Sequence, residues 1–308
     1  MGSEMCIRDR IEVNNLVKRY GNHTAVDHLS FKIEKGKIYG FLGPNGAGKS
    51  TTMNIITGYI ASTEGTVKID GHDILEEPEA AKKCIGYLPE LPPLYMDMTV
   101  KEYLDFVADL KQLEKSLRKR YVEEAMETTG TTEVAGRMIR NLSKGYRQRV
   151  GFAQAILGYP EIIILDEPTV GLDPKQIIEI RELIRHLGEK HTVILSSHIL
   201  PEISAVCDHV FIISKGKLVA SDSTENLVNL MSGAQEIELT VRTGAGEAAG
   251  YLQGEENIAR VEQADHDKIR IYAKKGADVR EEVFRQMAEH NIPVLEMKTV
   301  TKSLEDVF

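Results

Sequence analysis

The chain has 308 residues, a formal net charge of −9 and 28% charged residues, which is ordinary usage for a globular protein of about two domains. The acidic balance argues against a protein that binds the phosphate backbone of nucleic acid. No apolar run approaches the ~20 residues that cross a bilayer. Three widely spaced cysteines, Cys6, Cys84 and Cys207, indicate neither a metal-binding pair nor a disulfide framework.

The first two thirds of the chain alternate between strand and helix patterns. We exclude residues 1–10 from the fold as a non-native or disordered extension, because they join poorly to the patterned sequence that begins at Ile11. Short apolar runs predict strands at Ile11–Val17, Leu29–Ile33, Lys37–Leu42, Thr66–Ile69, Ile85–Leu88, Ile162–Asp166, Thr192–Ser196 and Val210–Ser214. Helical spacing predicts helices at Lys49–Thr57, Val100–Thr129, Ser143–Leu157 and Lys175–Leu187. The alternation favours an α/β domain over residues 11–222, with a largely parallel sheet and a helical subdomain at about 90–158.

The pattern changes near Met231–Ala234. The segments that follow read as strands and helices in the order βαββαβ: Ile237–Val241, Gly246–Leu252, Ile258–Glu262, Ile269–Ala273, Val279–His290 and Val294–Val300. This order predicts a small α+β, ferredoxin-like domain over residues 235–308. Its first helix is weakly supported because it contains glycines. A ligand sensor and a dimerisation or packing module are both open as its role.

A glycine-rich segment follows the third predicted strand. Gly43-Pro44-Asn45-Gly46-Ala47-Gly48-Lys49-Ser50-Thr51 matches the pattern G-x-x-x-x-G-K-[ST]. Glycines let successive backbone N–H groups point at phosphate oxygens, and the next helix aims its positive end at the same anion. Lys49 would reach the β- and γ-phosphates, and Ser50 would offer a hydroxyl to Mg²⁺. The segment therefore predicts that the chain binds ATP and Mg²⁺.

Two acidic residues end the apolar strand Ile162–Asp166. The carboxyl edge of a doubly wound sheet is where ligands bind, so Asp166 and Glu167 belong to the predicted nucleotide site. Asp166 would help to hold Mg²⁺, and Glu167 would orient and polarise the attacking water. A strand that ends in Asp-Glu is weak evidence alone, and the upstream phosphate loop is what favours this interpretation.

Further motifs resemble the ABC ATPase family. The run Leu142-Ser143-Lys144-Gly145-Tyr146-Arg147-Gln148-Arg149 resembles the family's signature sequence, whose common form is LSGGQ, and lies between the phosphate loop and the Asp-Glu strand. Gly171-Leu172-Asp173 resembles the D-loop. His198 is similar to the switch histidine, and Tyr20 to the aromatic residue that stacks on adenine. The resemblance covers about 11–221.

This resemblance implies a P-loop NTPase cassette, with a RecA-like core and a helical signature subdomain, that hydrolyses ATP. It implies that Ser143 and Gly145 open a helix whose N-terminus closes on the γ-phosphate bound to a second copy, so that two cassettes form a homodimer around two ATP molecules. His198 would hydrogen-bond the γ-phosphate. A separate integral membrane permease is the implied partner, with the chain peripheral at the cytoplasmic face of the plasma (inner) membrane.

Three residues depart from the common pattern. Glu90 stands where the family usually has a glutamine that contacts Mg²⁺ and senses the permease, and Lys144 and Tyr146 replace a glycine and a glutamine of the signature. These departures, with the ending Ser303–Phe308, resemble the ATPase subunits of ABC-2-type exporters. We expect Mg²⁺ dependence to be kept, because a carboxylate also reaches Mg²⁺ or its water. The apolar segment Leu91–Tyr95 would line the groove for the permease, although ordinary packing within the subdomain is an equal alternative.

A second function remains open. A family member without a permease could act on ribosomes or nucleic acid. Such proteins usually carry two cassettes in one chain, whereas this chain has one phosphate loop and one signature segment. The acidic net charge also disfavours nucleic acid, so no nucleic-acid partner is expected and transport is the preferred function.

Overall fold

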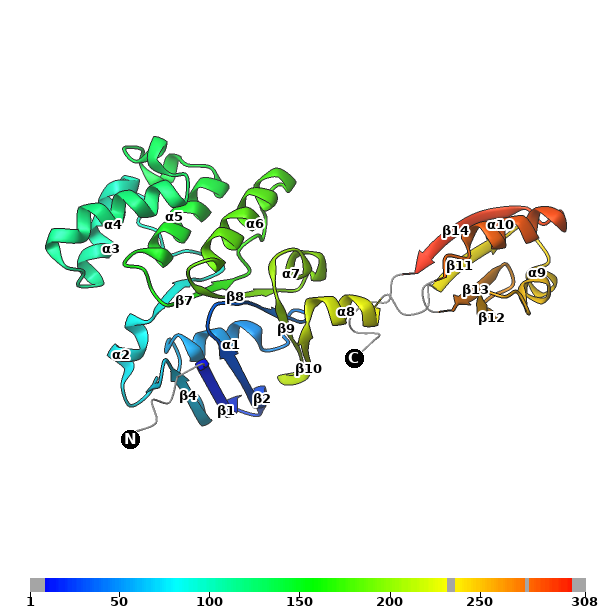
Figure 1. The fold of residues 1–308 in the computed structure, drawn as a ribbon, viewed down its shortest axis with the longest axis horizontal. Coiled ribbons are helices and arrows are strands. Elements are labelled where there is room, and N and C mark those ends of the chain that lie inside the picture. Colours follow the sequence, from blue (N-terminus) through cyan, green and yellow to red (C-terminus); the bar gives the residue numbers. More distant parts are fainter. Residues whose placement is uncertain (1–8, 232–235, 275–276, 301–308) are drawn as a thin grey trace, which may run out of the picture. The chain divides into compact units, whose positions relative to one another are not determined.

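The computed structural model describes residues 9–231, 236–274 and 277–300. These residues divide into two compact units, one ending at Thr224 and the other beginning at Glu225 (Figure 1). The segment Ser303–Phe308, which contributed to the ABC-2-type resemblance, lies outside the described residues.

The first unit is built on a six-stranded sheet in the order β10-β9-β3-β8-β7-β6. Its strands are β3 (Ile38–Leu42), β6 (Ile85–Leu88), β7 (Ile162–Asp166), β8 (Thr192–Ser197), β9 (His209–Ser214) and β10 (Lys217–Ser223). All neighbours pair in parallel except β10, which is antiparallel to β9 and was not predicted. Every residue of β3, β7 and β8 is buried. This explains their continuous apolar sequences, because both faces of the sheet are covered. The predicted parallel sheet is confirmed.

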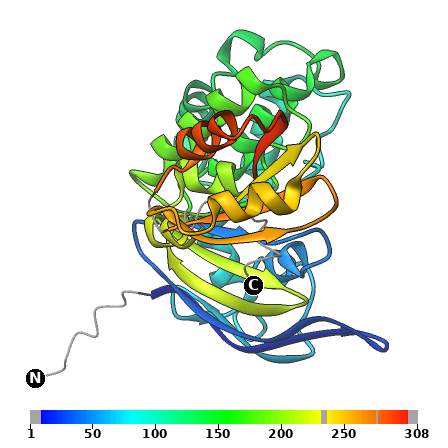
Figure 2. The same cartoon turned by 90° about the vertical axis from the view of Figure 1, so that its right-hand side faces the viewer.

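A second, antiparallel sheet has the order β2-β1-β4-β5. It consists of β1 (Asp9–Tyr20), β2 (His23–Glu34), β4 (Glu64–Ile69) and β5 (His72–Asp73). Figure 2 shows β1 and β2 as a long blue ribbon. The exclusion of all of residues 1–10 was wrong at its last two positions, since Asp9 and Arg10 belong to β1. Arg10 is held there by salt bridges of 2.6 Å to Asp70 and Glu161.

The helical subdomain contains α3 (Val100–Leu110), α4 (Lys115–Thr128) and α5 (Lys144–Ile156), which gather at one end of the unit in Figure 1. Two 3₁₀ turns, Thr132–Val134 and Ile139–Asn141, lie between α4 and α5. The prediction of one helical stretch over Val100–Thr129 was wrong, because the chain breaks after Leu110. Gln112 there has a φ of +54°, which ends a right-handed helix. The N-terminus of α3 carries a capping box between Thr99 and Glu102.

The other helices of the first unit are α1 (Lys49–Ile56), α2 (Pro78–Lys83), α6 (Pro174–Gly188) and α7 (Leu200–Val206), and α8 (Thr224–Met231) follows them. The core between the two sheets contains the aromatic group Phe31, Phe41 and Phe211, whose ring centroids lie 5.0–5.1 Å apart. None of the helices in the described ranges is both long enough and apolar enough to cross a membrane.

The second unit has its own sheet, in the order β12-β13-β11-β14 with all neighbours antiparallel. After α8, its elements are β11 (Glu236–Val241), α9 (Ala245–Leu252), β12 (Ile258–Gln263), β13 (Lys268–Ala273), α10 (Arg280–Glu289) and β14 (Val294–Val300). The predicted order βαββαβ is confirmed. One core joins alternate residues of β11 and β13 to α9 and α10, so both helices cover the same face of the sheet.

Candidate nucleotide site

The phosphate loop connects β3 to the N-terminus of α1. Gly48 is the residue before the helix and has a φ of +103°. A Cβ at this position would lie 2.5 Å from the carbonyl oxygen of Ala25, so both the backbone conformation and the space require glycine. Within the described structure no side chain caps the first turn of α1. Its backbone N–H groups therefore remain available for an anion.

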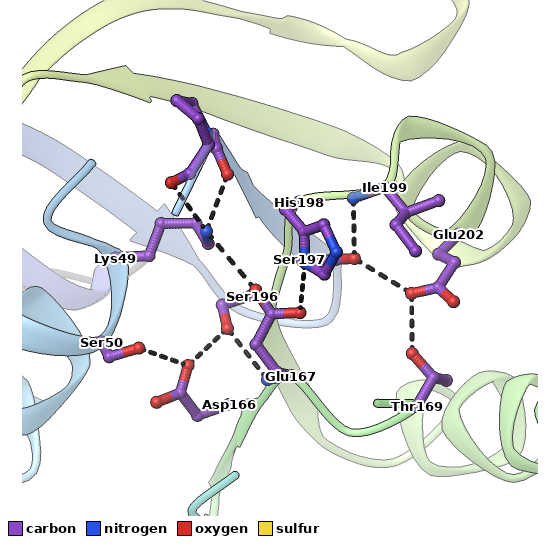
Figure 3. Close-up of polar contacts among 12 residues, drawn as sticks. Lys49, Ser50, Asp166, Glu167, Thr169, Ser196, Ser197, His198, Ile199 and Glu202 are labelled. Carbon is purple, nitrogen blue, oxygen red and sulfur yellow. Dashed lines mark hydrogen bonds and ion pairs between the residues drawn. The ribbon is translucent and has the colours of Figure 1, made fainter. Parts of the chain in front are cut away.

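Lys49 is buried at the base of this loop. Its ammonium group donates to the carbonyl oxygens of Gly43 at 2.7 Å and Pro44 at 3.2 Å, and lies 3.4 Å from Oε1 of Glu167 (Figure 3). Both charged side chains are less than a tenth exposed. Burial strengthens their attraction, because little water screens it. The cation predicted to contact phosphates thus lies directly beside the predicted water-orienting carboxylate.

Asp166 lies at the end of β7 with two hydroxyl groups on one of its oxygens. Ser196 on β8 donates to Oδ1 at 2.5 Å, and Ser50 of α1 donates to the same oxygen at 3.2 Å. The register explains the first contact, since Asp166 and Ser196 are partners in the parallel pair β7–β8. The strand edge and the phosphate loop therefore meet at a group of oxygen atoms, as the order of motifs predicted.

Glu167 is held from three sides. Its φ is +47°, in the left-handed region that non-glycine residues rarely adopt. Its backbone N–H donates to Ser196 Oγ at 3.0 Å, which stabilises this conformation. Its Oε2 accepts from Nδ1 of His198 at 3.0 Å, and because a carboxylate only accepts, Nδ1 carries the proton. Figure 3 shows Lys49 and His198 both directed at Glu167.

A cavity of about 400 Å³ opens over these residues. The predicted residues on its wall come from the phosphate loop and the start of α1, from the ends of β1, β7 and β8, and from the segment after β6. They are Tyr20, Asn45, Gly46, Gly48, Lys49, Ser50, Thr51, Glu90, Glu167 and His198. Three further residues were not predicted: His23, Ala25 and Val170. Gly43, Pro44 and Ala47 shape the loop from behind, the first two through their carbonyl contacts with Lys49 and the third through its N–H bond to Pro44 O.

Tyr20 and Glu90 lie at the rim of this region. The Tyr20 ring is 51% exposed at the end of β1, with the Lys18 ammonium 5.1 Å from its centroid. An exposed aromatic ring offers a face for stacking. Glu90 also lines a second cavity, of about 670 Å³, together with Ser50 and Asp166. The structure therefore brings Glu90 beside both residues predicted to hold Mg²⁺.

The signature residues surround a different cavity. Ser143, Gly145 and Tyr146 line a pocket of about 260 Å³ together with Leu172 of the predicted D-loop. Ser143 caps α5 by accepting from the N–H of Tyr146 at 3.3 Å. Among the described residues that line this pocket, none belongs to the phosphate loop. Within one chain, the two predicted anion sites, at the phosphate loop and at the signature segment, thus lie in different cavities.

The remaining predicted residues support the signature pocket. Leu142 is buried, and Lys144 reaches across to Gly171, where an added Cβ would meet its ammonium group. Asp173 caps α6 by accepting from the N–H of Gln176 at 3.0 Å. The Gln176 side chain fills the space beside Gly145, where a Cβ would lie 2.7 Å from Gln176 Cδ. A larger residue at position 145 would therefore displace the end of the Gln176 side chain, so glycine leaves room for that side chain beside the signature turn.

The sequence reasoning missed the hydroxyl and acidic residues behind Glu167 and His198. Ser196, Ser197, Thr169 and Glu202 form hydrogen bonds that connect the end of β7 to the end of β8. One signal was available, because Ser196 and Ser197 end a strand that runs parallel to the Asp166 strand. Glu202 gave no such signal, since its partner Thr169 is 33 residues away.

Comparison with known proteins gives a consistent result. A family model described as "ABC transporter" matches residues 26–170. The chain is 35% identical to the bacitracin transport ATP-binding protein BcrA of Bacillus licheniformis, over 97% of this chain and 95% of the relative. It is 34% identical to the linearmycin resistance ATP-binding protein LnrL of Bacillus subtilis (strain 168), over 97% and 96%.

Solved structures agree with these relatives. The ADP conformation of MJ1267, an ATP-binding cassette of an ABC transporter, has a TM-score of 0.65 and 26% identity, covering 73% of this chain and 95% of that one. The dimeric post-hydrolysis state of the cassette MJ0796, bound to ADP and Pi, has a TM-score of 0.63 and 25% identity, covering 70% and 98%. The fold of the first unit is thus matched in related ATP-binding cassettes, whose solved structures include forms with ADP.

Proposed function

This chain belongs to the ATP-binding subunits of ABC transporters, and from that premise we propose that two copies close around two ATP molecules and thereby power export through a separate membrane permease. The chain itself is an ATPase with the P-loop fold of these cassettes. One observation carries the proposal: the phosphate loop and Glu167 line one cavity, while Ser143 and Gly145 line another. Relatives named for bacitracin transport and linearmycin resistance support export as the direction.

The phosphate loop holds the triphosphate. Its backbone N–H groups and the first turn of α1 supply partial positive charge, and Lys49 supplies a full one. Because Lys49 contacts Gly43, Pro44 and Glu167 in this structure, it exchanges those partners for phosphate oxygens when the nucleotide binds. Tyr20, exposed at the rim of the same cavity, provides the face on which the adenine stacks.

The oxygen atoms of Ser50, Asp166 and Glu90 fit Mg²⁺. This ion prefers hydroxyl, carboxylate and water oxygens, and in nucleotide sites it takes only one or two carboxylates because phosphates supply the rest. Ser50 and Asp166 already share a hydrogen bond, and Glu90 lines a cavity with both. Mg²⁺, when bound there, neutralises charge on the phosphates. Glu90 adds negative charge at this point, which the common glutamine does not.

Glu167 positions the attacking water. In this structure its carboxylate contacts Lys49 and His198, and the contact with His198 is the one that still orients it after the nucleotide binds. When Lys49 turns to the phosphates, Glu167 loses a buried cation partner and becomes a stronger acceptor for a water proton. His198 donates to Glu167 through Nδ1, and it can also donate to the γ-phosphate through Nε2 when the ring is the imidazolium ion, in which both nitrogens carry protons.

The signature pocket completes the site on the partner copy. Ser143 and Gly145 lie at the N-terminus of α5, which favours an anion. Lys144, Tyr146 and Leu142 belong to the same turn, and Asp173 fixes the start of α6 beside it. A single copy therefore holds ATP with half of each site, and hydrolysis requires the dimer.

The permease docks at the 670 Å³ cavity, which gives the chain a peripheral position at the cytoplasmic face of the membrane. Its wall combines Glu90 with apolar and aromatic residues such as Leu91, Pro93 and Tyr59. Leu91 is 80% exposed, and exposed apolar side chains that gather in one place favour a protein partner. Because Glu90 and Asp166 line the same cavity, a docked segment lies next to the nucleotide site.

The test uses the substitution Glu167→Gln. The substitution replaces one carboxylate oxygen with an amide and removes the negative charge that draws the water proton. Turnover should therefore fall by about 100-fold or more while ATP binding stays intact, because only the step of water activation is lost. The trapped, ATP-bound protein is then purified from membranes and the proteins that accompany it are identified. Co-purification of an integral membrane protein is the expected result.

The matched control carries Lys49→Ala in addition to Glu167→Gln, so that it cannot retain ATP. It should lose the membrane protein if ATP-driven closure controls the complex. Recovery of ribosomal subunits or nucleic acid in place of a membrane protein would contradict transport and support the alternative function. Wild-type turnover in Glu167→Gln would remove this residue from the catalytic role.

A further inference from the structure

Glu202 lies on α7, outside the cavity, yet it is only 7% exposed. Its Oε2 accepts from Thr169 Oγ1 at 2.7 Å and from Ser197 Oγ at 3.0 Å. The salt bridges of the described residues do not include Glu202. A buried carboxylate that is balanced by two hydroxyl groups and no cation is costly to the fold, which favours a role in the site.

The two hydroxyl partners of Glu202 belong to the two segments that carry the reactive groups. Thr169 follows Glu167 by two residues, and Ser197 immediately precedes His198. Ser197 Oγ also accepts from the N–H of Ile199 at 3.0 Å, so it fixes the backbone on the far side of His198. Figure 3 shows these contacts running from Thr169 through Glu202 and Ser197 to Ile199.

The contacts form a closed ring. Glu167 accepts a hydrogen bond from His198 at 3.0 Å. Glu202 connects the same two segments a second time, because it accepts from one hydroxyl group in the segment of Glu167 and from another next to His198. His198 is itself 38% exposed, so packing holds it little and its position depends on its hydrogen bonds. We infer that Glu202 is a positioning residue for ATP hydrolysis, which holds the His198 loop against the segment of Glu167. This inference rests on the proposed roles of Glu167 and His198.

Replacement of Glu202 should affect the chemical step and spare nucleotide binding. In Glu202→Ala, kcat should fall by about 10- to 100-fold, as expected for a misplaced catalytic group, with KM for ATP changed less than about twofold. Glu202→Gln keeps one acceptor oxygen and should recover part of the loss. The matched control is Glu79→Ala, which removes an exposed acid from the first turn of α2 and should leave kcat unchanged.

A double-substitution cycle separates positioning from a general loss of structure. ATP hydrolysis by the full chain is compared for wild type, Glu202→Ala, His198→Ala and the double variant, and ADP affinity reports the folded fraction. If Glu202 acts through His198, the double variant should be within about twofold of His198→Ala. Losses that multiply would overturn the inference, because they would show that Glu202 acts independently of His198.

The outcomes distinguish the inference from the function on which it rests. Low turnover in His198→Ala with normal turnover in Glu202→Ala would overturn only the role of Glu202. Normal turnover in His198→Ala would overturn the role of His198 and, with it, any positioning through that residue. Reduced kcat in both single variants, no further loss in the double variant and partial recovery in Glu202→Gln would support the inference.

Discussion

At the scale of single residues, one hydroxyl group organises both acids of the site. Ser196 Oγ donates to the Asp166 carboxylate and accepts from the backbone N–H of Glu167. A serine serves both contacts because its hydroxyl is a donor and an acceptor at once. The left-handed conformation of Glu167 costs free energy in isolation, and this hydrogen bond offsets part of that cost. The direction of the Glu167 side chain thus depends on a residue of the neighbouring strand.

Lys49→Ala tests the phosphate loop at this scale. The substitution removes the only cation among the described residues that line the nucleotide cavity, apart from the histidines. Loss of a charge-assisted contact should weaken ATP binding by at least about tenfold. Isothermal calorimetry with ATP measures this loss. The control is Lys101→Ala, an exposed position on α3 that should bind as wild type. Unchanged ATP affinity in Lys49→Ala would refute the assignment of the loop.

At the scale of elements, α5 connects two functional regions. Its N-terminus, capped by Ser143, lines the signature pocket, and its C-terminus reaches the proposed docking cavity. Lys111, which follows α3, donates to the carbonyl oxygens of Gln154 at 3.0 Å and Leu157 at 2.8 Å at that end. A cation at a helix C-terminus satisfies carbonyls that have no partner within the helix. The position of α5 therefore depends on a residue that follows α3, two helices earlier in the chain.

The Lys111 contact predicts a pH dependence of stability. Burial lowers the pKa of Lys111 from 10.5 to about 8. Below pH 8 the amine is protonated in the folded and the unfolded protein, and the folded state bears the cost of burying the charge. Above pH 10.5 it is neutral in both, so this cost is absent. Between these limits the unfolded state binds more protons, and the Lys111 contribution to stability rises with pH.

Comparison with Lys111→Met isolates this contribution, because methionine is an unbranched side chain that does not titrate. The free energies of unfolding of the two proteins are measured by urea denaturation at several pH values from 7 to 10. The difference, wild type minus variant, should increase with pH over this range. A difference that decreases would show that the charge-assisted bonds to the carbonyls outweigh the cost of burial.

At the scale of the whole molecule, the described residues of each unit include a hydrophobic core of their own. The first lies between the two sheets of the nucleotide-binding unit, and the second joins α9 and α10 to their own sheet. All of the described residues that line the nucleotide and signature cavities belong to the first unit. Nucleotide binding is therefore expected to depend on the first unit alone. We propose the second unit as an accessory domain.

Truncation after Met231 tests this independence. The shortened chain should bind ADP within about twofold of the full chain, because its core and its site are complete. The thermal unfolding of the full chain should show two transitions, of which the smaller is absent after truncation. Calorimetry measures both quantities. Loss of ADP binding in the shortened chain, together with a single transition in the full one, would show that the units fold as one.

The sequence by itself determined those parts whose chemistry is local. The loop at Gly43–Thr51, and the place of Asp166 and Glu167 at the end of a strand, need only neighbouring residues, because a strand, a tight turn and a helix N-terminus suffice to place them. The direction of the Glu167 side chain also needs Ser196. The strands of the parallel sheet were predicted for the same reason, since burial on both faces leaves a continuous apolar run. Two long strands were predicted too short. Positive φ values at Asn15 and His28, and shifts of register between β1 and β2, interrupt their alternation.

Only the tertiary structure decided the contacts between distant segments. The break after Leu110 placed Lys111 on carbonyl oxygens more than 40 residues away, and β8 brought Ser196 to Asp166. Glu202 meets Thr169 because α7 packs behind the strand edge, which no spacing along the chain encodes. The separation of the phosphate loop from the signature pocket is likewise a result of packing. Such contacts depend on how elements pack together, whereas sequence periodicity reports only how each element faces the core.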